Sequence, residues 1–554
     1  MNRRQAFSLY VCHALSTWNA RSYEFAAVLF TAAAFPEGLR AASFVGIANS
    51  IAAILFGSAI GRWIDRGQSR LRTLLTTILI NHAAVIAACT MWLLIVQGAA
   101  NDADDDRNAE VQDIINTSIL TGTPKIMFFL ILLGLGVVES VSRKANLISI
   151  ERDWVPVLAP PTVAEGYDLT HVNAIMGMID MMCKMVAPIV VSQLIAIVSS
   201  KAAALILAVA NAIPFGLEIL AAKNLWRANT ALRAEKENLK DSDNMHPGQM
   251  QENISEAWAQ QPVVWVFDVA LSYMDNLQLY FESEVWAPSL AMCITHGSIL
   301  SVTGVTVVFF LDSGYSLQLV TIAETVSAFF ELSSTLITPF AVHAISKTTD
   351  ARLAADIPLM SVEDVGRLDE DSGDVNNGST KSSPVVNTAI THTGLYGIST
   401  MCLILISTIP ALFYLTSQLS YPIPRSETKH GSPTFHSYPF ATVIILSCLA
   451  ISRLGRGIFS LSTQQLGQSR VASEHRSSFA GVEVGFVSLL GLAHNVASAV
   501  FSEPKEFGIL ATGSWISLAC SAALYIWWLR REGVQFAWWN AGGKRKYQQL
   551  EGDD

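Results

Sequence analysis

The first long apolar stretch of the chain, residues 9–35, reads LYVCHALSTWNARSYEFAAVLFTAAAF. A helix needs about 20 mostly apolar residues to cross a bilayer, so this stretch is long enough to span one. Asn19, Arg21 and Glu24 lie in its middle. A charge at this depth costs about 2.5–3.5 kcal/mol on insertion scales, and such residues usually face the protein interior or a water-filled path. The stretch is therefore predicted to line a transport pathway; alternatively, Arg21 and Glu24 simply pair with each other.

The composition is that of a membrane protein. Of the 554 residues, 51% are hydrophobic and 15% are charged, whereas soluble domains carry about 25% charged residues. The net charge of −10 comes without any basic stripe, so a nucleic-acid partner is not expected. The seven cysteines lie in apolar segments without a C-x-x-C pair, so neither a disulfide framework nor a structural zinc site is predicted.

Long apolar segments recur along the whole chain. The predicted spans are residues 9–35, 41–60, 71–96, 126–150, 169–197, 202–222, 288–311, 317–345, 389–415, 440–466, 479–501 and 507–528. Residues 263–286 are amphipathic and are predicted to lie at the interface or to lead into the seventh span. Lys and Arg gather in alternate connections, which places both termini in the cytoplasm.

This layout predicts an all-α, polytopic fold of about twelve transmembrane helices in two six-helix lobes, as in major facilitator carriers. The predicted parts are an N-terminal lobe (1–225), a cytoplasmic inter-lobe loop (226–262), a C-terminal lobe (263–530) with a disordered cytoplasmic loop (347–387), and a cytoplasmic tail (531–554). No P-loop motif and no large soluble domain occur, so we expect a carrier or channel, and not an enzyme or an ATP-driven pump.

Two charged motifs are predicted to close the cytoplasmic mouth. The second span ends in Gly61-Arg-Trp-Ile-Asp-Arg-Gly67, which resembles the G-x-x-x-D-R element of major facilitator proteins. Glu151-Arg-Asp-Trp154 lies at the matching end of the fourth span. Ion pairs between such ends can break and re-form during alternating access; alternatively, these are ordinary charges at the membrane edge. The predicted gate comprises Asp65, Arg66, Arg152, Asp153, Asn173, Asp180 and Arg476.

Polar residues within the spans are the candidate ligands. The set in the N-terminal half is Glu24, Asn81, His82, Asn173, Asp180, Asn211 and Glu218. Asn211 and Glu218 are two helical turns apart and so share a face, with Pro214 between them. Carboxylates and amides suit hard divalent cations, and imidazole suits iron, zinc, nickel or cobalt.

In the C-terminal half, His494 and the pair Cys293 and His296 are candidate ligands. Cys293 and His296 form a C-x-x-H on the seventh span, which is unusually polar and interrupted by glycines. Such breaks often mark transporter binding sites. The alternative is that these side chains only make contacts between packed helices.

Several of these motifs carry a resemblance to one family. The pattern L-Y-x-x-H-x-L-S-T-W-x-x-R in the first span, Gly61-Arg-Trp-Ile-Asp65, Glu151-Arg-Asp-Trp-Val155 and Glu503-Pro-Lys-Glu-Phe-Gly508 resemble the ferroportin family, solute carrier family 40. The resemblance implies a major facilitator fold, export of ferrous iron and one metal site in each lobe. By position, His494 matches the family's C-lobe histidine ligand, and Asn211 and Glu218 match an N-lobe polar pair.

The chain also departs from the animal members of that family. Ala20 stands where they have an aspartate, Glu24 where they have a histidine, and Asn81 where they have a glutamine. Gly304 aligns with their cysteine, a metal ligand and the anchor for hepcidin, so hepcidin binding is not expected. Glu24 is closer to the plant and fungal branch and is a candidate to rebuild the N-lobe site. Cys293 or His296 could replace the missing sulfur.

The predicted metal ligands are therefore Glu24, Asn81, Asn211, Glu218, Cys293, His296 and His494. We expect export of Fe²⁺, with cobalt, nickel, manganese or zinc as further possible substrates, driven by membrane potential or a proton gradient. The ion is substrate, and no resident cofactor is expected. We expect the membrane to be a plasma or vacuolar one. The alternatives are a proton-coupled carrier of an organic solute, with Glu24, Asp180 and Glu218 as relay groups, and a non-transporting receptor that has lost its ligands.

Overall fold

The computed structural model shows a chain of helices. It describes residues 1–34, 40–100, 123–159, 167–198, 200–234, 273–300, 306, 309–310, 313, 315–356, 384–419, 438–501 and 506–532. No strand occurs in these ranges. The predicted connections at 101–122, most of 226–262 and the tail from 533 lie outside them. The loop at 347–387 was predicted to be disordered, but its first part is helical, because α13 continues to Asp356, and its last residues begin α15 at Pro384. Residues 357–383 lie outside the described ranges.

The chain divides into two compact units. Unit 1 contains Met1–Glu284, Glu331–Leu336 and Gly467–Val500, and unit 2 contains Val285–Phe330, Ile337–Leu466 and Phe501–Asp554. These differ from the predicted lobes chiefly because helix α19 (Arg476–Val500) packs along α2 (Arg40–Arg66) and so falls in unit 1.

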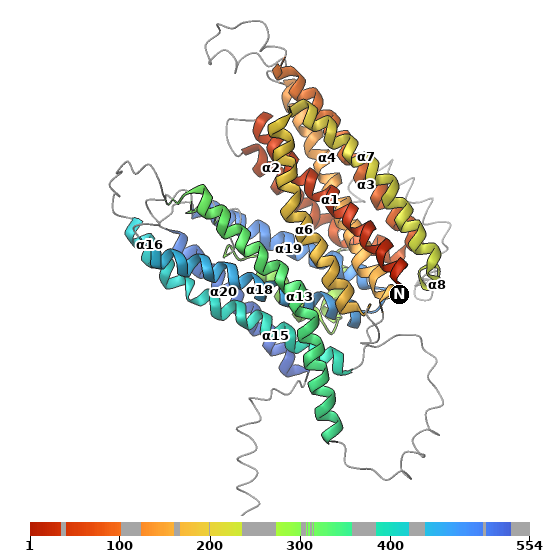
Figure 1. Cartoon of the computed structure of the whole chain (residues 1–554), viewed down its shortest axis with the longest axis vertical. Coiled ribbons are helices and arrows are strands. Elements are labelled where there is room, and N and C mark those ends of the chain that lie inside the picture. Colours follow the sequence, from red (N-terminus) through yellow and green to blue (C-terminus); the bar gives the residue numbers. More distant parts are fainter. Residues whose placement is uncertain are drawn as a thin grey trace, which may run out of the picture. The chain divides into compact units, whose positions relative to one another are not determined.

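Unit 1 is a bundle of long helices. Besides α2 and α19, its elements are α1 (Arg3–Ala34), α3 (Arg70–Ala100), α4 (Thr123–Ile148), the π-helical turn η1 (Ser149–Trp154), α5 (Val155–Leu158), α6 (Leu169–Ile197), α7 (Ser200–Ala228) and α8 (Thr230–Arg233). Helix α1 packs on α6 and α7, and α3 packs on α4 and α7 (Figure 1). Their facing sides bury apolar residues, among them Phe30, Trp92 and Val191 towards one end of α1 and Leu9, Ile78 and Trp154 towards the other.

The crossing of α2 and α19 depends on small residues. A Cβ built on Gly57 would lie 2.7 Å from the backbone oxygen of Gly481, and a Cβ on Gly481 would meet the backbone of Gly57. Glycines let helix backbones approach this closely inside a membrane, where packing rather than hydrophobicity drives association. This contact holds the start of α19 beside the end of α2, where the predicted gate residue Asp65 lies.

Unit 2 contains α11 (Trp286–Thr295), α15 (Pro384–Ile406), α16 (Thr408–Leu419), α20 (Phe507–Arg531) and most of α13 (Leu317–Asp356) and α18 (Pro439–Arg470). The predicted seventh span is interrupted, because helix α11 ends at Thr295. The backbone beyond it is satisfied by side chains: Ile299 N donates to Ser514 Oγ at 3.1 Å, and Thr306 Oγ1 donates to Ile299 O at 2.7 Å. Non-helical backbone at membrane depth requires such partners.

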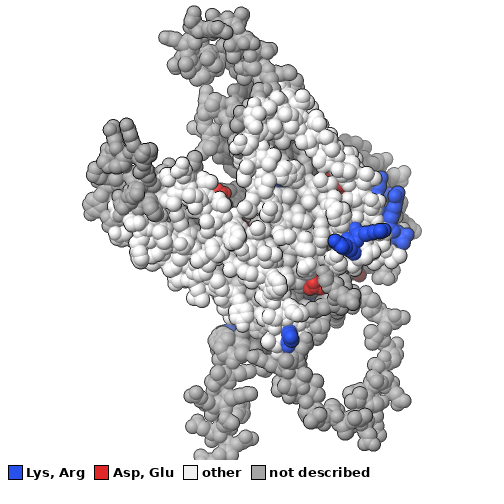
Figure 2. All heavy atoms as spheres, in the orientation of Figure 1, with Lys and Arg blue, Asp and Glu red and all other residues white. Residues whose placement is uncertain are grey.

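The outer surface fits a lipid environment. Nine helices within the described ranges are long and apolar enough to cross a membrane. Large apolar side chains such as Ile197, Phe340 and Phe440 are exposed, and the described face in Figure 2 carries few charges. The predicted all-helical, multi-pass membrane fold is thus confirmed. In the same view, Lys and Arg gather at the end of unit 1 that holds the N-terminus and α8 (Figures 1 and 2).

Candidate functional site

A buried polar cluster lies among four helices of unit 1. Its members are Asn19 on α1, Asn81 and His82 on α3, Asn146 on α4, and Asn211 and Glu218 on α7. All six are buried, and Glu218 has no exposed surface. Buried polar groups of this kind are tolerated when they find partners, and most of the partners here come from within the cluster.

The amide side chains form a directed chain of hydrogen bonds. Asn81 Nδ2 donates to the backbone oxygen of Glu139 at 3.2 Å, and Asn19 Nδ2 donates to Asn81 Oδ1 at 3.1 Å. Asn211 Nδ2 in turn donates to Asn19 Oδ1. Because a backbone oxygen can only accept, it fixes the orientation of each amide along the chain. The oxygen of Asn211 is thereby turned towards His82.

The imidazole of His82 is held between two oxygen atoms. Its Nδ1 lies 2.5 Å from Asn211 Oδ1, and its Nε2 lies 2.9 Å from Glu218 Oε2. The prediction that Asn211 and Glu218 share a helix face is therefore confirmed, since both contact one ring. Asn146 Nδ2 approaches the other carboxylate oxygen at 3.4 Å, and the ring of Phe215 packs against the imidazole at 5.1 Å between centroids.

The cluster combines imidazole, carboxylate and amide oxygens, which suit borderline first-row divalent metals. Among the described residues, no group of three or more His, Cys, Asp or Glu is arranged to hold a metal ion. A cation at this place would therefore depend on amide oxygens in addition to His82 and Glu218. A cavity of about 210 Å³ adjoins the cluster and is lined by Asn19 and Asn211 together with Tyr23.

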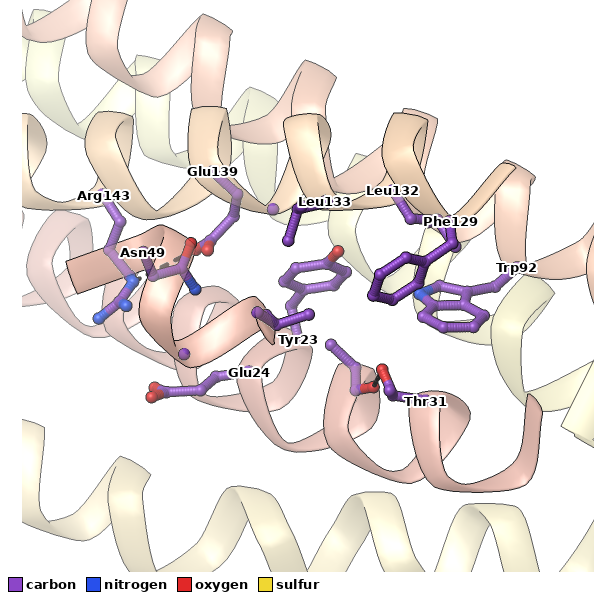
Figure 3. Close-up of a pocket in the computed structure, with 14 residues that line it drawn as sticks. Tyr23, Glu24, Thr31, Asn49, Trp92, Phe129, Leu132, Leu133, Glu139 and Arg143 are labelled. Atoms are coloured by element: carbon purple, nitrogen blue, oxygen red, sulfur yellow. Dashed lines mark hydrogen bonds and ion pairs between the residues drawn. The ribbon is translucent and has the colours of Figure 1, made fainter. Parts of the chain in front are cut away.

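Glu24 lies outside this cluster, although Asn81, Asn211 and Glu218 are in it. Its carboxylate pairs with Arg21 at 3.3 Å, so the alternative pairing expected from the sequence is present. Arg21 also pairs with Asp180, one of the predicted gate residues, at 3.1 Å. Figure 3 shows Glu24 lining a second pocket with Tyr23, Glu139 and Arg143. The role of Glu24 as a metal ligand stays a prediction.

Several predicted gate residues meet where α2, η1 and α19 come together. The carboxylate of Asp65 accepts hydrogen bonds from the backbone N–H groups of Ser477 and Ser478, at 3.1 and 2.6 Å. These N–H groups lie in the first turn of α19, where helices leave donors unsatisfied and favour negative charge. Arg152 of η1 contacts Glu483 of α19 at 2.5 Å. Together these bonds join three elements far apart in the sequence.

Further contacts extend this junction. Asp153 pairs with Arg70 at 3.0 Å, and Asn173 bonds to Gln468, whose amide also donates to the backbone oxygen of Glu151 at 2.7 Å. Of the other predicted gate residues, Arg476 donates a hydrogen bond to the backbone oxygen of Val471 at 3.2 Å, and Arg66 is exposed. Sequence reasoning did not select Arg70, Gln468 or Glu483, because their partners come from distant segments.

The candidate ligands of the C-terminal half are divided between the units. His494 lies half-buried on α19 in unit 1. Cys293 is buried on α11 in unit 2. His296 follows the last residue of α11, and its Nδ1 lies 3.1 Å from Arg456 Nη2. A metal site built from these residues stays a prediction.

Comparisons with known proteins give one consistent result. The family model described as Ferroportin1 (FPN1) matches residues 3–354 and 380–518. "Solute carrier family 40 member 1" of Oryza sativa subsp. japonica is 23% identical, covering 93% of this chain and 89% of that protein. "Ferroportin" of Homo sapiens is 21% identical, covering 94% of this chain and 90% of its own length.

Solved structures show the same fold. A bacterial homologue of the iron transporter ferroportin, crystallised in an outward-facing state, superposes with a TM-score of 0.66 at 16% identity, covering 95% of this chain and 99% of that one. The proton:xylose symporter XylE, a major facilitator protein, superposes with a TM-score of 0.55 at 10% identity, covering 96% of each chain.

Proposed function

Because the chain belongs to the ferroportin family, we propose that it carries divalent metal ions across a membrane by alternating access, with export of ferrous iron from the cytosol as its leading activity. Relatives that span nearly the whole chain bear the names ferroportin and solute carrier family 40, and a bacterial homologue was crystallised with soaked iron. Cobalt, nickel, manganese and zinc are further candidate substrates, since the same ligand types serve them.

One observation carries this proposal: the His82 ring between Asn211 Oδ1 and Glu218 Oε2 inside a membrane bundle. An isolated buried carboxylate would be costly, whereas a site that exchanges ions with water-filled cavities has reason to keep one. We assign the cation site of this unit to His82 Nε2 and the Glu218 carboxylate, with Asn211, Asn19 and Asn81 as positioning residues. Asn81, Asn211 and Glu218 were predicted from the sequence as metal ligands, whereas His82 was identified there only as a polar residue within a span.

Binding at this site displaces a proton. The amide chain turns an oxygen towards His82 Nδ1, so Nδ1 donates, and the proton between Nε2 and Glu218 is shared by these two groups. A metal ion that binds Nε2 and the carboxylate takes the place of that proton, because metal ligands must be deprotonated. Metal binding is therefore expected to weaken as the pH falls, and a proton gradient can drive transport.

The junction of α2, η1 and α19 is proposed as the cytoplasmic gate. Its bonds are polar and reversible, and they join helix ends rather than apolar cores. The Lys and Arg residues near the N-terminus and α8 support a cytoplasmic location for this end (Figure 2). The membrane is proposed to be a plasma or vacuolar one. Control by hepcidin is not part of the proposal; Gly304, the position concerned, lies outside the described residues.

The runner-up function is proton-coupled transport of a small organic solute. The pocket in Figure 3 favours it, because Tyr23, Trp92 and Phe129 give part of that pocket an aromatic wall. This carrier would need no metal, so a competition experiment separates the two functions.

The test is Fe²⁺ flux into proteoliposomes. We expect His82→Gln and Glu218→Gln each to lower flux by at least about tenfold, since losing even an outer-shell partner of a metal ligand typically costs about 10–100-fold. His171→Gln is the matched control, since this histidine is exposed at the start of α6. Co²⁺ should compete with Fe²⁺, and a non-metal solute should not. Full flux in both cluster variants would overturn the site, and absence of metal flux in the folded wild type would favour the organic-solute carrier.

A further inference from the structure

Exposed arginines gather at one end of unit 1. They come from four helix ends: α1 supplies Arg3 and Arg4, α3 supplies Arg72, α7 supplies Arg227 and α8 supplies Arg233. All five residues are exposed. Figure 2 shows Lys and Arg gathered at the end of the unit that holds the N-terminus and α8 in Figure 1. We call these five residues the arginine patch.

A hydrogen bond fixes the start of α1 against the end of α7. Gln5 Nε2 donates to the backbone oxygen of Ala228 at 2.7 Å. Gln5 also exchanges hydrogen bonds with Asn2, N–H to side-chain oxygen in both directions at 2.9 Å, which closes the first turn of α1 as a capping box. Arg4 precedes Gln5 and Arg227 precedes Ala228 in the chain. Two exposed arginines therefore lie on ordered backbone beside one interhelical bond.

A second contact joins the start of α3 to α8. Arg70 Nη1 donates to the backbone oxygen of Ala234, the residue after α8, at 3.0 Å, and Arg70 Nε binds Asp153 at 3.0 Å. Arg233 directly precedes Ala234, and Arg72 lies two residues after Arg70. The neutralised Arg70 thus ties together two helix ends that each carry an exposed arginine.

The carboxylates close to these helix ends already have other partners. Asp153 binds Arg70, and Asp65 accepts hydrogen bonds from the first turn of α19. Asp168 accepts a hydrogen bond from the backbone at the start of α6. Within the part of the chain that the structure describes, no arginine of the patch pairs with a carboxylate. The patch therefore presents five positive charges to its surroundings.

Neighbouring aromatic residues place the patch at the level of the lipid headgroups. Phe7 is 69% exposed and lies four residues after Arg3, on the same face of α1. Trp226 is half-buried and directly precedes Arg227. Tryptophan prefers the membrane–water interface, and arginine side chains reach from there towards the headgroups. The guanidinium groups are thus positioned to meet the phosphates of one leaflet.

The type and arrangement of the charges define the ligand. A guanidinium binds phosphate oxygens through two parallel hydrogen bonds, whereas a lysine acts as a point charge. A headgroup with a single negative charge would engage one arginine at a time. A headgroup with several phosphates can engage arginines from neighbouring helices together, and their fixed positions lower the cost of binding it. Clusters of four to eight basic residues beside transmembrane helices are typical of binding to such lipids.

We propose that the arginine patch binds the headgroup of a phosphoinositide, an inositol lipid that carries two or more phosphate groups. Arg4 and Arg227 bind one phosphate, Arg72 and Arg233 bind another, and Arg3 adds positive charge beside them. This site differs in residues and in chemistry from the His82 cluster and from the junction of α2, η1 and α19. It does not depend on the proposed metal transport, because it is defined by lipid binding alone.

The test uses the full-length protein in nanodiscs of zwitterionic phosphatidylcholine. Binding of a fluorescent short-chain phosphatidylinositol bisphosphate is followed by fluorescence anisotropy. Each basic residue near the surface contributes about fivefold to binding of an anionic lipid, so Arg4→Gln with Arg227→Gln should weaken the affinity about 25-fold. Arg72→Gln with Arg233→Gln should have the same effect.

Two further variants separate the patch from general membrane-edge charge and from misfolding. Arg530→Gln with Arg531→Gln removes two exposed arginines from the end of α20 in unit 2, and it should leave the affinity unchanged. Arg4→Lys with Arg227→Lys keeps the charges that guide membrane insertion, and its affinity should lie between those of the wild type and the Gln variant.

Competing ligands identify the source of the phosphate. Short-chain phosphatidylserine at the same total charge should not displace the probe, and inositol trisphosphate, which lacks acyl chains, should displace it only at a much higher concentration than the unlabelled lipid does.

Three results would overturn the proposal. The first is an equal loss of affinity in the α20 control, which would make the attraction a general property of charge at the membrane edge. The second is a Lys variant as weak as the Gln variant, which would assign the loss to folding. The third is displacement by phosphatidylserine or by the free headgroup as effective as displacement by the unlabelled lipid. Fe²⁺ flux measured on the same preparations tests the proposed transport function separately, so each idea can fail alone.

Discussion

The ion pair between Arg152 and Glu483 should control how often the junction of α2, η1 and α19 opens. The two charged atoms lie 2.5 Å apart, and the side chains are 10% and 14% exposed. Close charge pairs at protein interfaces have coupling energies of about 1.5–7 kcal/mol, and residual exposure places this one near 2 kcal/mol. At 1.4 kcal/mol for a factor of ten, losing the pair should raise the open population about thirtyfold.

The assay is the rate at which a membrane-impermeant maleimide modifies Ser478→Cys. Ser478 is buried and its N–H bonds to Asp65, so the engineered thiol reacts only when the junction opens. The seven native cysteines, all free thiols, are first replaced. Arg152→Gln and Glu483→Gln should each raise the rate about thirtyfold, and the charge swap Arg152→Glu with Glu483→Arg should restore it towards wild type.

An unchanged modification rate in both single variants would refute this reasoning. It would also be refuted if the charge-swapped double variant reacted as fast as expected from adding the effects of the two single variants. The exposed Arg66 supplies the control, because Arg66→Gln removes a nearby charge without touching the pair.

Two further outcomes follow from the same interface, both measured by thermal unfolding in detergent micelles. Gly57→Ala should destabilise the protein by about 1–3 kcal/mol, because its Cβ would lie 2.7 Å from the backbone of Gly481; Gly46→Ala on the same helix, with nothing within 4 Å of its Cβ, should not. Asp65→Asn should lower the free energy of unfolding by about 1 kcal/mol, because it weakens the hydrogen bonds to the first turn of α19. Equal stability of Asp65→Asn and Arg66→Gln would rule out this capping role.

The helices of the bundle were largely predictable from apolar length. The expected span at 169–197 coincides with α6 (Leu169–Ile197), since polar segments flank it on both sides. The span at 202–222 was too short, because α7 continues to Ala228 through Lys223 and Arg227. Hydropathy detects the part of a helix that lies in hydrocarbon, whereas the helix itself runs on into the charged interface.

The membership of the polar cluster was only partly predictable. Asn211 and Glu218 were paired correctly from their spacing of two turns on one helix. Glu24 was expected to rebuild the metal site because it stands where the animal members of the family have a histidine. It lies five residues after Asn19, which rotates its side chain by about 140° around the helix axis, and it lines another cavity. The spacing of two residues along one helix therefore predicts whether they lie on the same face of that helix.

Spacing could not reveal His82, which was visible as an intramembrane polar residue but had no partner on its own helix. Its role depends on α3 packing beside α7, so that one ring meets both Asn211 and Glu218. The helix that carries the charge of Glu218 is evident from the sequence, whereas the helix that supplies its partner is fixed by packing between distant segments. Mutations that shift α3 relative to α7 without altering any ligand should therefore impair cation binding.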